Sequence, residues 1–181
     1  MHNSNAMSSF IGTNLPAWTV TDLSDSSSIS LTSIAIGKFL IIDFWTSKCT
    51  KCPAALDKLD NEAVKYASNA VFISCALSQG SGNKEIVVDL IEGCWENMRH
   101  MFMDMEEKES AKALFGFTQV PFCVVVSPSG TVVAAGEPKT LDLSMLLSVG
   151  TEEMVENKNT NLIQALAPSV IASGFVLDED F

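Results

Sequence analysis

One stretch, residues 41–53, constrains the fold of this chain more than any other. It begins with a run of apolar, β-prone residues that ends at Trp45, which is typical of a buried central strand. A short polar loop follows, and Cys49 and Cys52 then stand three positions apart at the start of a helical pattern. A strand, a tight loop, two cysteines and a helix form the arrangement that reversible dithiol chemistry requires.

The two cysteines are expected to differ in their chemistry. Cys49 lies nearer to the predicted helix N-terminus, where unpaired N–H groups and the positive end of the helix dipole stabilise a thiolate. Cys52 lies one turn further along, close enough to attack a mixed disulfide made by Cys49. We therefore predict that Cys49 is the exposed nucleophile with a low pKa and that Cys52 is the buried resolving thiol.

A cysteine pair at this spacing is also found as one half of a zinc site. Such a site needs further ligands, but Cys75, Cys94 and Cys123 are scattered singly, and the only histidines are His2 and His100. Dithiol redox chemistry is therefore favoured over metal binding. The sequence predicts no metal site and no cofactor.

The same stretch resembles the thioredoxin superfamily. Asp43-Phe44-Trp45, followed by three residues and then C-x-x-C, reproduces in register the segment that joins strand and active site in that family. The resemblance implies that Asp43 is the buried carboxylate that moves protons for the inner thiol. That role requires a carboxyl group whose pKa is raised by burial.

A second motif supports this resemblance, because Val120 and Pro121 directly precede a β-branched run. Proline is unusual at a central strand unless it caps the start of the strand. In thioredoxin-like folds a cis-proline occupies this position beside the active-site disulfide, and Val120-Pro121 matches it; a plain trans proline is the alternative. The resemblance implies that the backbone of Val120 is the edge on which an extended substrate segment docks as an added strand.

The chain departs from the family pattern around its cysteines. Thioredoxins usually carry Trp before the first cysteine and Gly-Pro between the two, whereas this chain has Lys48 and Thr50-Lys51. Exposed polar and positively charged residues beside the cysteines (Lys48, Thr50 and Lys51, called here the cationic lip) therefore replace a flat apolar surface. The predicted substrate-binding set consists of Trp45, Lys48, Thr50, Lys51, Val120 and Pro121.

Three parts are predicted along the chain. Residues 1–10 form a polar N-terminus that is expected to be disordered and resembles a tag remnant. Residues 11–150 are predicted to form an α/β domain with a thioredoxin-like fold, in which helices flank a central mixed β-sheet and an N-terminal hairpin precedes it. This order of elements resembles the TlpA-like and peroxiredoxin-like branch of the superfamily. Residues 151–181 are predicted to be a C-terminal helix and an acidic tail, which either packs on the domain or docks a protein partner.

Within the domain, each element is predicted from periodicity and from turn residues. Helices are expected at 49–67, 84–98, 106–115 and 141–149, and strands at 71–77, 100–105, 122–126 and 131–135, besides the central strand.

Composition limits the partners and the compartment. The net charge of −11 argues against nucleic acid and anionic membranes as partners. The chain has no run of about 18 apolar residues, the length that a membrane-spanning helix needs. Five cysteines without a regular framework indicate a reducing compartment, and the N-terminus does not resemble a signal peptide. A cytoplasmic location is therefore expected.

The predicted function is that of a thiol–disulfide oxidoreductase, which takes electrons from a thiol or a reductase and reduces or exchanges protein disulfides. A peroxiredoxin-like peroxidase is an alternative because Thr46 lies at Thr-x-x-Cys spacing, although Asp43 stands where that family has proline. A Sco-like copper carrier would need a wider cysteine spacing and a suitable histidine, for which His100 alone is weak support. The last alternative is a redox-inactive adaptor that keeps the fold and binds a protein partner.

Overall fold

The computed structural model describes residues 10–144 and 146, which belong to one compact unit. In chain order its elements are β1 (Thr19–Asp22), β2 (Ser28–Ser30), the 3₁₀ helix η1 (Leu31–Ser33), β3 (Phe39–Trp45), α1 (Cys52–Lys65), β4 (Ala70–Leu77), α2 (Asn83–Ile91), β5 (Arg99–Met103), α3 (Met105–Phe115), β6 (Phe122–Val126) and β7 (Val132–Gly136). The disorder predicted for residues 1–9, and the helix and acidic tail predicted for 151–181, lie outside the described residues. None of the described helices has the length and apolar character needed to span a bilayer.

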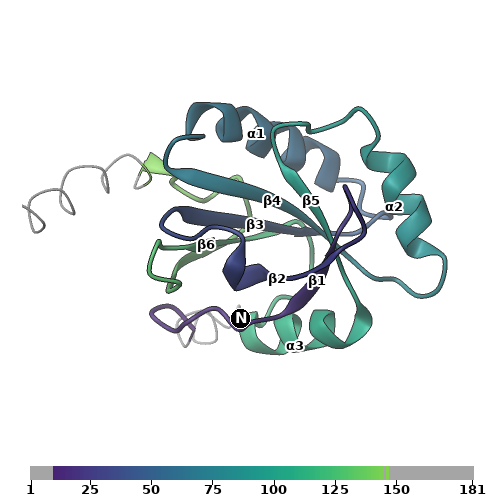
Figure 1. The fold of residues 1–181 in the computed structure, drawn as a ribbon, viewed down its shortest axis with the longest axis horizontal. Helices are drawn as coiled ribbons and strands as arrows, with labels where there is room; N and C mark the ends of the chain where they lie inside the picture. The colour runs from purple at the N-terminus through teal and green to yellow at the C-terminus, as the bar shows by residue number, and fades with distance from the viewer. Residues whose placement is uncertain (1–9, 145, 147–181) are drawn as a thin grey trace, which may run out of the picture. The chain divides into compact units, whose positions relative to one another are not determined.

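All seven strands join one mixed sheet in the order β2-β1-β5-β4-β3-β6-β7 (Figure 1). Strands β3, β4 and β5 run parallel, whereas β1, β6 and β7 pair antiparallel with their neighbours. All residues of β3 are buried, and β3 pairs with β4 on one side and with β6 on the other. The prediction of a central strand within a mixed α/β sheet is confirmed, as is the hairpin that β1 and β2 form.

Helices α1 and α3 lie on opposite faces of this sheet (Figure 1). Because side chains alternate along a strand, β3 directs Phe44 to one face and Asp43 to the other. Phe44 belongs to the large apolar core that also contains Phe115 of α3. The opposite face, which α1 covers, therefore receives Asp43. Phe10, assigned from sequence to the disordered N-terminus, is buried in the Phe44 core at 1% exposure, so that boundary was wrong by at least one residue.

Two predicted helices have different ends in the structure. Helix α1 begins at Cys52 and not at Cys49, with Pro53 in its first turn, where the missing N–H costs little. Helix α2 ends at Ile91 and does not continue to residue 98. Gly93 and Trp95 adopt positive φ angles of 69° and 52°, which a right-handed helix cannot contain.

The other boundaries follow local chemistry. Gly116, at φ 67°, ends α3, and its N–H donates to the carbonyl of Lys112. The predicted helix at 141–149 is only partly described, and residues 141–143 are not helical. There the Asp142 carboxylate accepts the N–H of Ser144, a local bond that competes with helix formation.

Candidate active site

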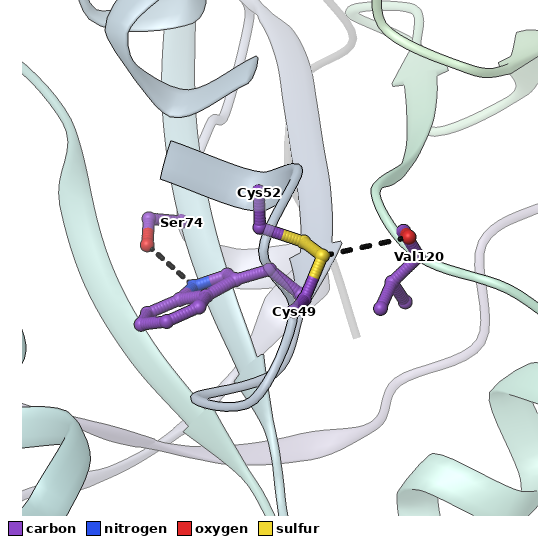
Figure 2. The surroundings of a disulfide bond; sticks show 5 residues. Cys49, Cys52, Ser74 and Val120 are labelled. Carbon is purple, nitrogen blue, oxygen red and sulfur yellow. Dashed lines mark hydrogen bonds between the residues drawn. A yellow bond between two sulfur atoms is a disulfide. The ribbon is translucent and has the colours of Figure 1, made fainter. Parts of the chain in front are cut away.

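Cys49 and Cys52 form a disulfide between the end of β3 and the start of α1, with their Cα atoms 5.4 Å apart (Figure 2). Cys49 lies in the turn before the helix, where its N–H donates to the carbonyl of Thr46 at 3.0 Å. The Cys52 N–H in turn lies 3.3 Å from the Cys49 carbonyl. The cysteine pair therefore lies at the N-terminus of α1, directly after the turn that follows β3.

The two sulfur-bearing residues differ in exposure. Cys49 is half-buried, whereas Cys52 is completely covered, at 0% exposure. An external thiol or disulfide reaches Cys49 more readily than Cys52. This placement agrees with the predicted nucleophile and resolving thiol, and the assignment of those roles stays a prediction.

Val120 faces the disulfide from the loop that precedes β6. The Cys49 Sγ lies 3.5 Å from the Val120 carbonyl oxygen (Figure 2), and the Val120–Pro121 peptide bond is cis. A disulfide sulfur has no proton, so this is a contact in the oxidised state; a Cys49 thiol at the same place can donate to that oxygen. The structure thus brings together two sequence motifs that lie 71 residues apart.

Asp43 is buried on the α1 side of the sheet, at 0% exposure. Neither carboxyl oxygen has a hydrogen-bond partner among the described residues. Burial raises the pKa of this carboxyl well above its ordinary value, because the charged form loses its hydration and gains no compensating bond. A raised pKa makes this carboxylate a stronger base than an ordinary aspartate, which is the direction that the predicted proton-transfer role requires.

Two further cysteines, Cys75 and Cys123, are buried thiols close to Asp43. Burial is the main cause that raises the pKa of each thiol, and the charge of Asp43 adds to it. Cys123 pairs directly across from Asp43 in the sheet. Buried thiols with raised pKa values are poor nucleophiles, so neither competes with Cys49 for a substrate.

Trp45 does not lie where the sequence-based prediction placed it. Its side chain is only 3% exposed, and its indole N–H donates to the Ser74 hydroxyl at 2.8 Å. The ring also packs edge-on against Trp95, with centroids 6.0 Å apart. We therefore correct the assignment of Trp45 as a substrate contact, because strand burial turns the indole inward.

The cationic lip is exposed as expected. Lys48, Thr50 and Lys51 are all exposed around the disulfide, and their contact with a substrate stays a prediction. The pKa of Glu137 is lowered mainly by its bond to Lys139, and the charge of Lys51 contributes to the shift. Lys58 of α1 donates to the carbonyl of Pro138 at 3.0 Å, which holds the loop after β7 against α1.

Sequence reasoning missed a polar network beside the active-site turn. The Asn83 side-chain N–H donates to the Ser47 hydroxyl at 2.8 Å, and Ser47 donates to Gln79 Oε1 at 2.8 Å. The network closes where the Gln79 backbone N–H donates to Asn83 Oδ1 at 3.0 Å. An Asn at the start of a helical pattern was the only available signal, and its partner Ser47 lies 36 residues away.

The alternative chemistries find little support in the part of the chain that the structure describes. It contains no group of three or more His, Cys, Asp or Glu side chains that could hold a metal ion. Arg99 is the single arginine of the sequence, and it lies on β5, two strands away from β3. Its guanidinium donates to Asp22 of β1 at 2.6 Å. It is therefore not placed to serve Cys49 as the catalytic arginine of a peroxidase.

Comparisons with known proteins give the fold a name. The chain matches no family model and no curated protein in sequence. It is similar in structure to the thioredoxin domain of a thiol-disulfide oxidoreductase from Bacteroides vulgatus, with a TM-score of 0.61 and 19% identity over 82% of this chain and 96% of that one.

Two other solved structures agree. A thiol:disulfide interchange protein from a Bacteroides species has a TM-score of 0.58 at 19% identity, over 69% of this chain and 80% of its own. An exposed lipoprotein thioredoxin from Streptococcus pneumoniae has a TM-score of 0.58 at 18% identity, over 73% of this chain and 98% of its own. The fold is thioredoxin-like, and the predicted fold class is confirmed.

Proposed function

We propose that this protein is a thiol–disulfide oxidoreductase that reduces or exchanges protein disulfides. The observation that carries the proposal is the asymmetric disulfide at the start of α1. Its half-buried Cys49 touches the Val120 carbonyl, and its Cys52 is completely covered. The similar solved structures are those of thiol–disulfide oxidoreductases and thioredoxins, which supports the same chemistry.

In the proposed reaction, the reduced protein donates two electrons to a substrate disulfide. The Cys49 thiolate attacks one substrate sulfur, a mixed disulfide forms, and the other substrate sulfur leaves as a thiolate that takes a proton. The Cys52 thiolate then attacks the Cys49 sulfur, which forms the Cys49–Cys52 disulfide and releases the second substrate thiol. A thiol or a reductase returns the pair to the dithiol form.

Asp43 is proposed to take the proton that Cys52 must lose before it attacks. Its raised pKa suits this exchange, because a carboxyl with an ordinary pKa is too weak a base to accept a proton from a thiol. Asp43 lies on the sheet face that α1 covers, and Cys52 is the first residue of α1. Both groups are shielded from water, so the proton does not exchange freely with solvent.

Substrate is proposed to dock along the loop before β6. Val120 and Pro121 are half-buried, the Val120 carbonyl touches the disulfide, and Val120 offers backbone groups to an extended segment. The exposed Lys48, Thr50 and Lys51 are proposed to contact the substrate on the other side of Cys49.

Reduction of insulin by dithiothreitol tests the function. We expect the protein to accelerate this reduction, and Cys49→Ser to abolish the acceleration. Cys94→Ser, which changes an exposed cysteine outside the disulfide, is the control and should retain full activity. A wild type without activity would favour the adaptor, and consumption of peroxide without insulin reduction would favour the peroxidase.

A trapping experiment tests the order of the two cysteines. Cys52→Ala should accumulate a mixed disulfide with the substrate through Cys49, because no resolving thiol remains. In the reduced wild type, alkylation at mildly acidic pH should label Cys49 first. Labelling of Cys52 or Cys75 before Cys49 would contradict the assignment.

We also propose that the protein works in a reducing, cytoplasmic compartment. The described residues include three cysteines outside the disulfide, and Cys94 among them is exposed. Such a thiol persists best where glutathione keeps it reduced. Alkylation of intact cells with a membrane-permeant reagent should find Cys94 as a free thiol, whereas a disulfide at Cys94 would indicate an oxidising location.

A further inference from the structure

No carboxylate pairs with Lys48 or Lys51 in the described part of this acidic chain. The described ion pairs are Lys65–Glu62, Arg99–Asp22, Lys108–Glu109, Lys112–Glu109 and Lys139–Glu137. Lys38 and Lys58 donate to backbone carbonyls, whereas Lys84 of α2 is half-buried and has no ion pair among those described. Two exposed lysines without a paired carboxylate therefore stand beside the disulfide of a chain whose net charge is −11.

Their positions put them next to the reacting sulfur. Lys48 directly precedes Cys49, and Lys51 directly precedes Cys52. The charge of Lys51 contributes slightly to the lowered pKa of Glu137, but the Glu137 carboxylate is bonded to Lys139 at 2.6 Å. A substrate segment that brings its sulfur to Cys49 therefore places its neighbouring side chains beside two free positive charges.

We propose that this lip selects disulfides flanked by acidic residues. The inference rests on the proposed oxidoreductase function and specifies its substrate class. An exposed charge pair is worth about two- to fivefold in an equilibrium, so two pairs give about a tenfold preference at low salt. Distant acidic groups of the chain repel such a substrate weakly, because the Debye length is only about 8 Å at physiological ionic strength.

Two matched peptide disulfides test the preference. Both carry the same fluorescent reporter, with Asp and Glu beside the cysteine in one and Asn and Gln in the other. We expect the reduced wild type to reduce the acidic peptide about tenfold faster in kcat/KM at low salt, and less than about twofold faster at 0.5 M salt. The double variant Lys48→Gln/Lys51→Gln should lose the preference at low salt.

Lys38→Gln is the matched control, because Lys38 precedes β3 at the opposite end of that strand. It should keep the tenfold ratio. The ratio between peptides cancels any change in the reactivity of the Cys49 thiolate. Equal rates with both peptides would overturn the substrate class and leave the oxidoreductase intact, whereas failure to reduce either peptide would overturn both.

A second inference comes from the network of Ser47, Gln79 and Asn83. Asn83 is the first residue of α2 and is only 5% exposed, and both ends of its side-chain amide are bonded within the network. Its partner Ser47 lies in the turn that leads to Cys49. The network therefore ties the active-site turn to the start of α2.

The loop on the far side of this network is itself anchored. The N–H of Ser78 donates to the Met103 carbonyl at 2.9 Å, and Lys108 Nζ donates to the Ser78 carbonyl at 2.7 Å. Strand β5 and helix α3 thus fix the segment that holds Gln79. An anchored partner can restrain the turn at Ser47, whereas a mobile one could not.

We infer that Asn83 is a positioning residue for the dithiol. When the disulfide opens, the network keeps the turn and its Cys49 sulfur close to Cys52, which raises the effective concentration of one thiol at the other. A higher effective concentration favours disulfide formation. Without the network, the equilibrium with glutathione shifts toward the dithiol.

The redox equilibria of Asn83→Ala, of Ser47→Ala and of the double variant test this role. We expect each single variant to reduce the equilibrium constant for disulfide formation against glutathione about fivefold, which is about 20 mV at about 30 mV per tenfold. The double variant should lose no more than either single variant, because both remove the same contact. Asn61→Ala, which removes an exposed side-chain bond on α1, is the control and should match the wild type.

The equilibrium separates positioning from simple stability. A lower midpoint of unfolding with a glutathione equilibrium within twofold of the wild type would overturn the inference, as would additive effects in the double variant. Ser47→Ala leaves the bond between Gln79 and Asn83 in place, so it remains informative if Asn83→Ala does not fold.

Discussion

The two faces of the central sheet are built on different chemistry, although the same strands supply both. On the α3 side, Phe115 packs against Phe10 and Trp18, with ring centroids 5.1 and 5.6 Å away, within a large cluster of buried apolar residues. On the α1 side, the sheet buries polar groups, including the Asp43 carboxyl and the hydroxyl of Ser74. Adjacent residues of β3, Phe44 and Asp43, belong to these two different environments.

The difference separates stability from reactivity. Aromatic packing on the α3 side removes apolar surface from water and contributes to stability. The unpartnered Asp43 carboxyl on the α1 side opposes folding, because a buried polar group without a hydrogen bond is costly. That same environment raises its pKa, which makes the carboxylate a stronger base toward a thiol proton. One face thus offsets the energetic cost of the other.

The largest effect is expected from Phe115→Ala on the α3 side. Removal of this fully buried ring should lower the free energy of unfolding by about 3–5 kcal/mol, through lost burial and the cavity that remains. Its glutathione equilibrium should match that of the wild type, because the ring lies on the face away from Asp43. Urea unfolding and redox titration measure the two quantities. A shifted redox equilibrium in a folded variant would show that the faces are not separate.

A smaller effect of opposite sign is expected from Asp43→Ala on the α1 side. This change removes an unsatisfied buried carboxyl, so the free energy of unfolding at pH 7 should rise by about 1–3 kcal/mol, less any loss from the small cavity. Reduction of insulin should become slower, because Cys52 loses its proton acceptor. Asp25→Asn, at an exposed carboxyl, is the control and should change neither quantity by much. A destabilised variant would contradict the view that Asp43 opposes folding.

The pH dependence of the free energy of unfolding tests whether the buried Asp43 carboxyl opposes folding when it is charged. The pKa of Asp43 is higher in the folded chain than in the unfolded one, so the folded state retains its proton over the interval between the two values. The Asp43 contribution to stability is therefore greatest below the unfolded value of about 3.9 and decreases as pH rises through the folded value. Relative to the wild type, Asp43→Ala should gain stability between pH 4 and pH 8. A constant difference over that range would contradict the raised pKa.

Local sequence patterns predicted the parts of the site that depend on neighbours in the chain. The buried strand β3, the cysteine pair after it and the Val120-Pro121 segment each carry a compact signal, because strand burial and turns leave characteristic residues within a few positions. The family resemblance then implied that these segments meet. The structure places the Cys49 sulfur 3.5 Å from the Val120 carbonyl, a contact between distant segments that sequence periodicity cannot predict.

What the sequence did not predict depends on distant contacts. Trp45 looked available to a substrate, but its hydrogen bond to Ser74 and its packing on Trp95 come from segments 29 and 50 positions away. The continuation of α2 to residue 98 followed apolar periodicity, whereas the chain leaves the helix after Ile91. There Trp95 donates to Asp57 of α1 at 2.7 Å, so a tertiary bond holds a backbone conformation that local propensity disfavours.

The smallest expected effect concerns Lys51, on the α1 side at the edge of the site. A cation near the Cys49 sulfur stabilises the thiolate by Coulomb attraction, and this adds to the helix dipole. A stabilised thiolate favours the dithiol and makes the disulfide a better oxidant. Because Lys51 is exposed, solvent and salt screen its charge, and the expected contribution is modest.

Reversal of that charge in Lys51→Glu should therefore lower the reduction potential of the Cys49–Cys52 pair by about 10–30 mV at low salt. Titration against glutathione measures the shift, and 0.5 M salt should shrink it, because short-range screening removes most of an exposed interaction. Lys38→Glu reverses a cation at the far end of β3 and should leave the potential unchanged, so it separates a local effect from one of net charge. A potential that stays the same or rises in Lys51→Glu would show that backbone dipoles and the covered position of Cys52, and not the lip, set the redox balance of this face.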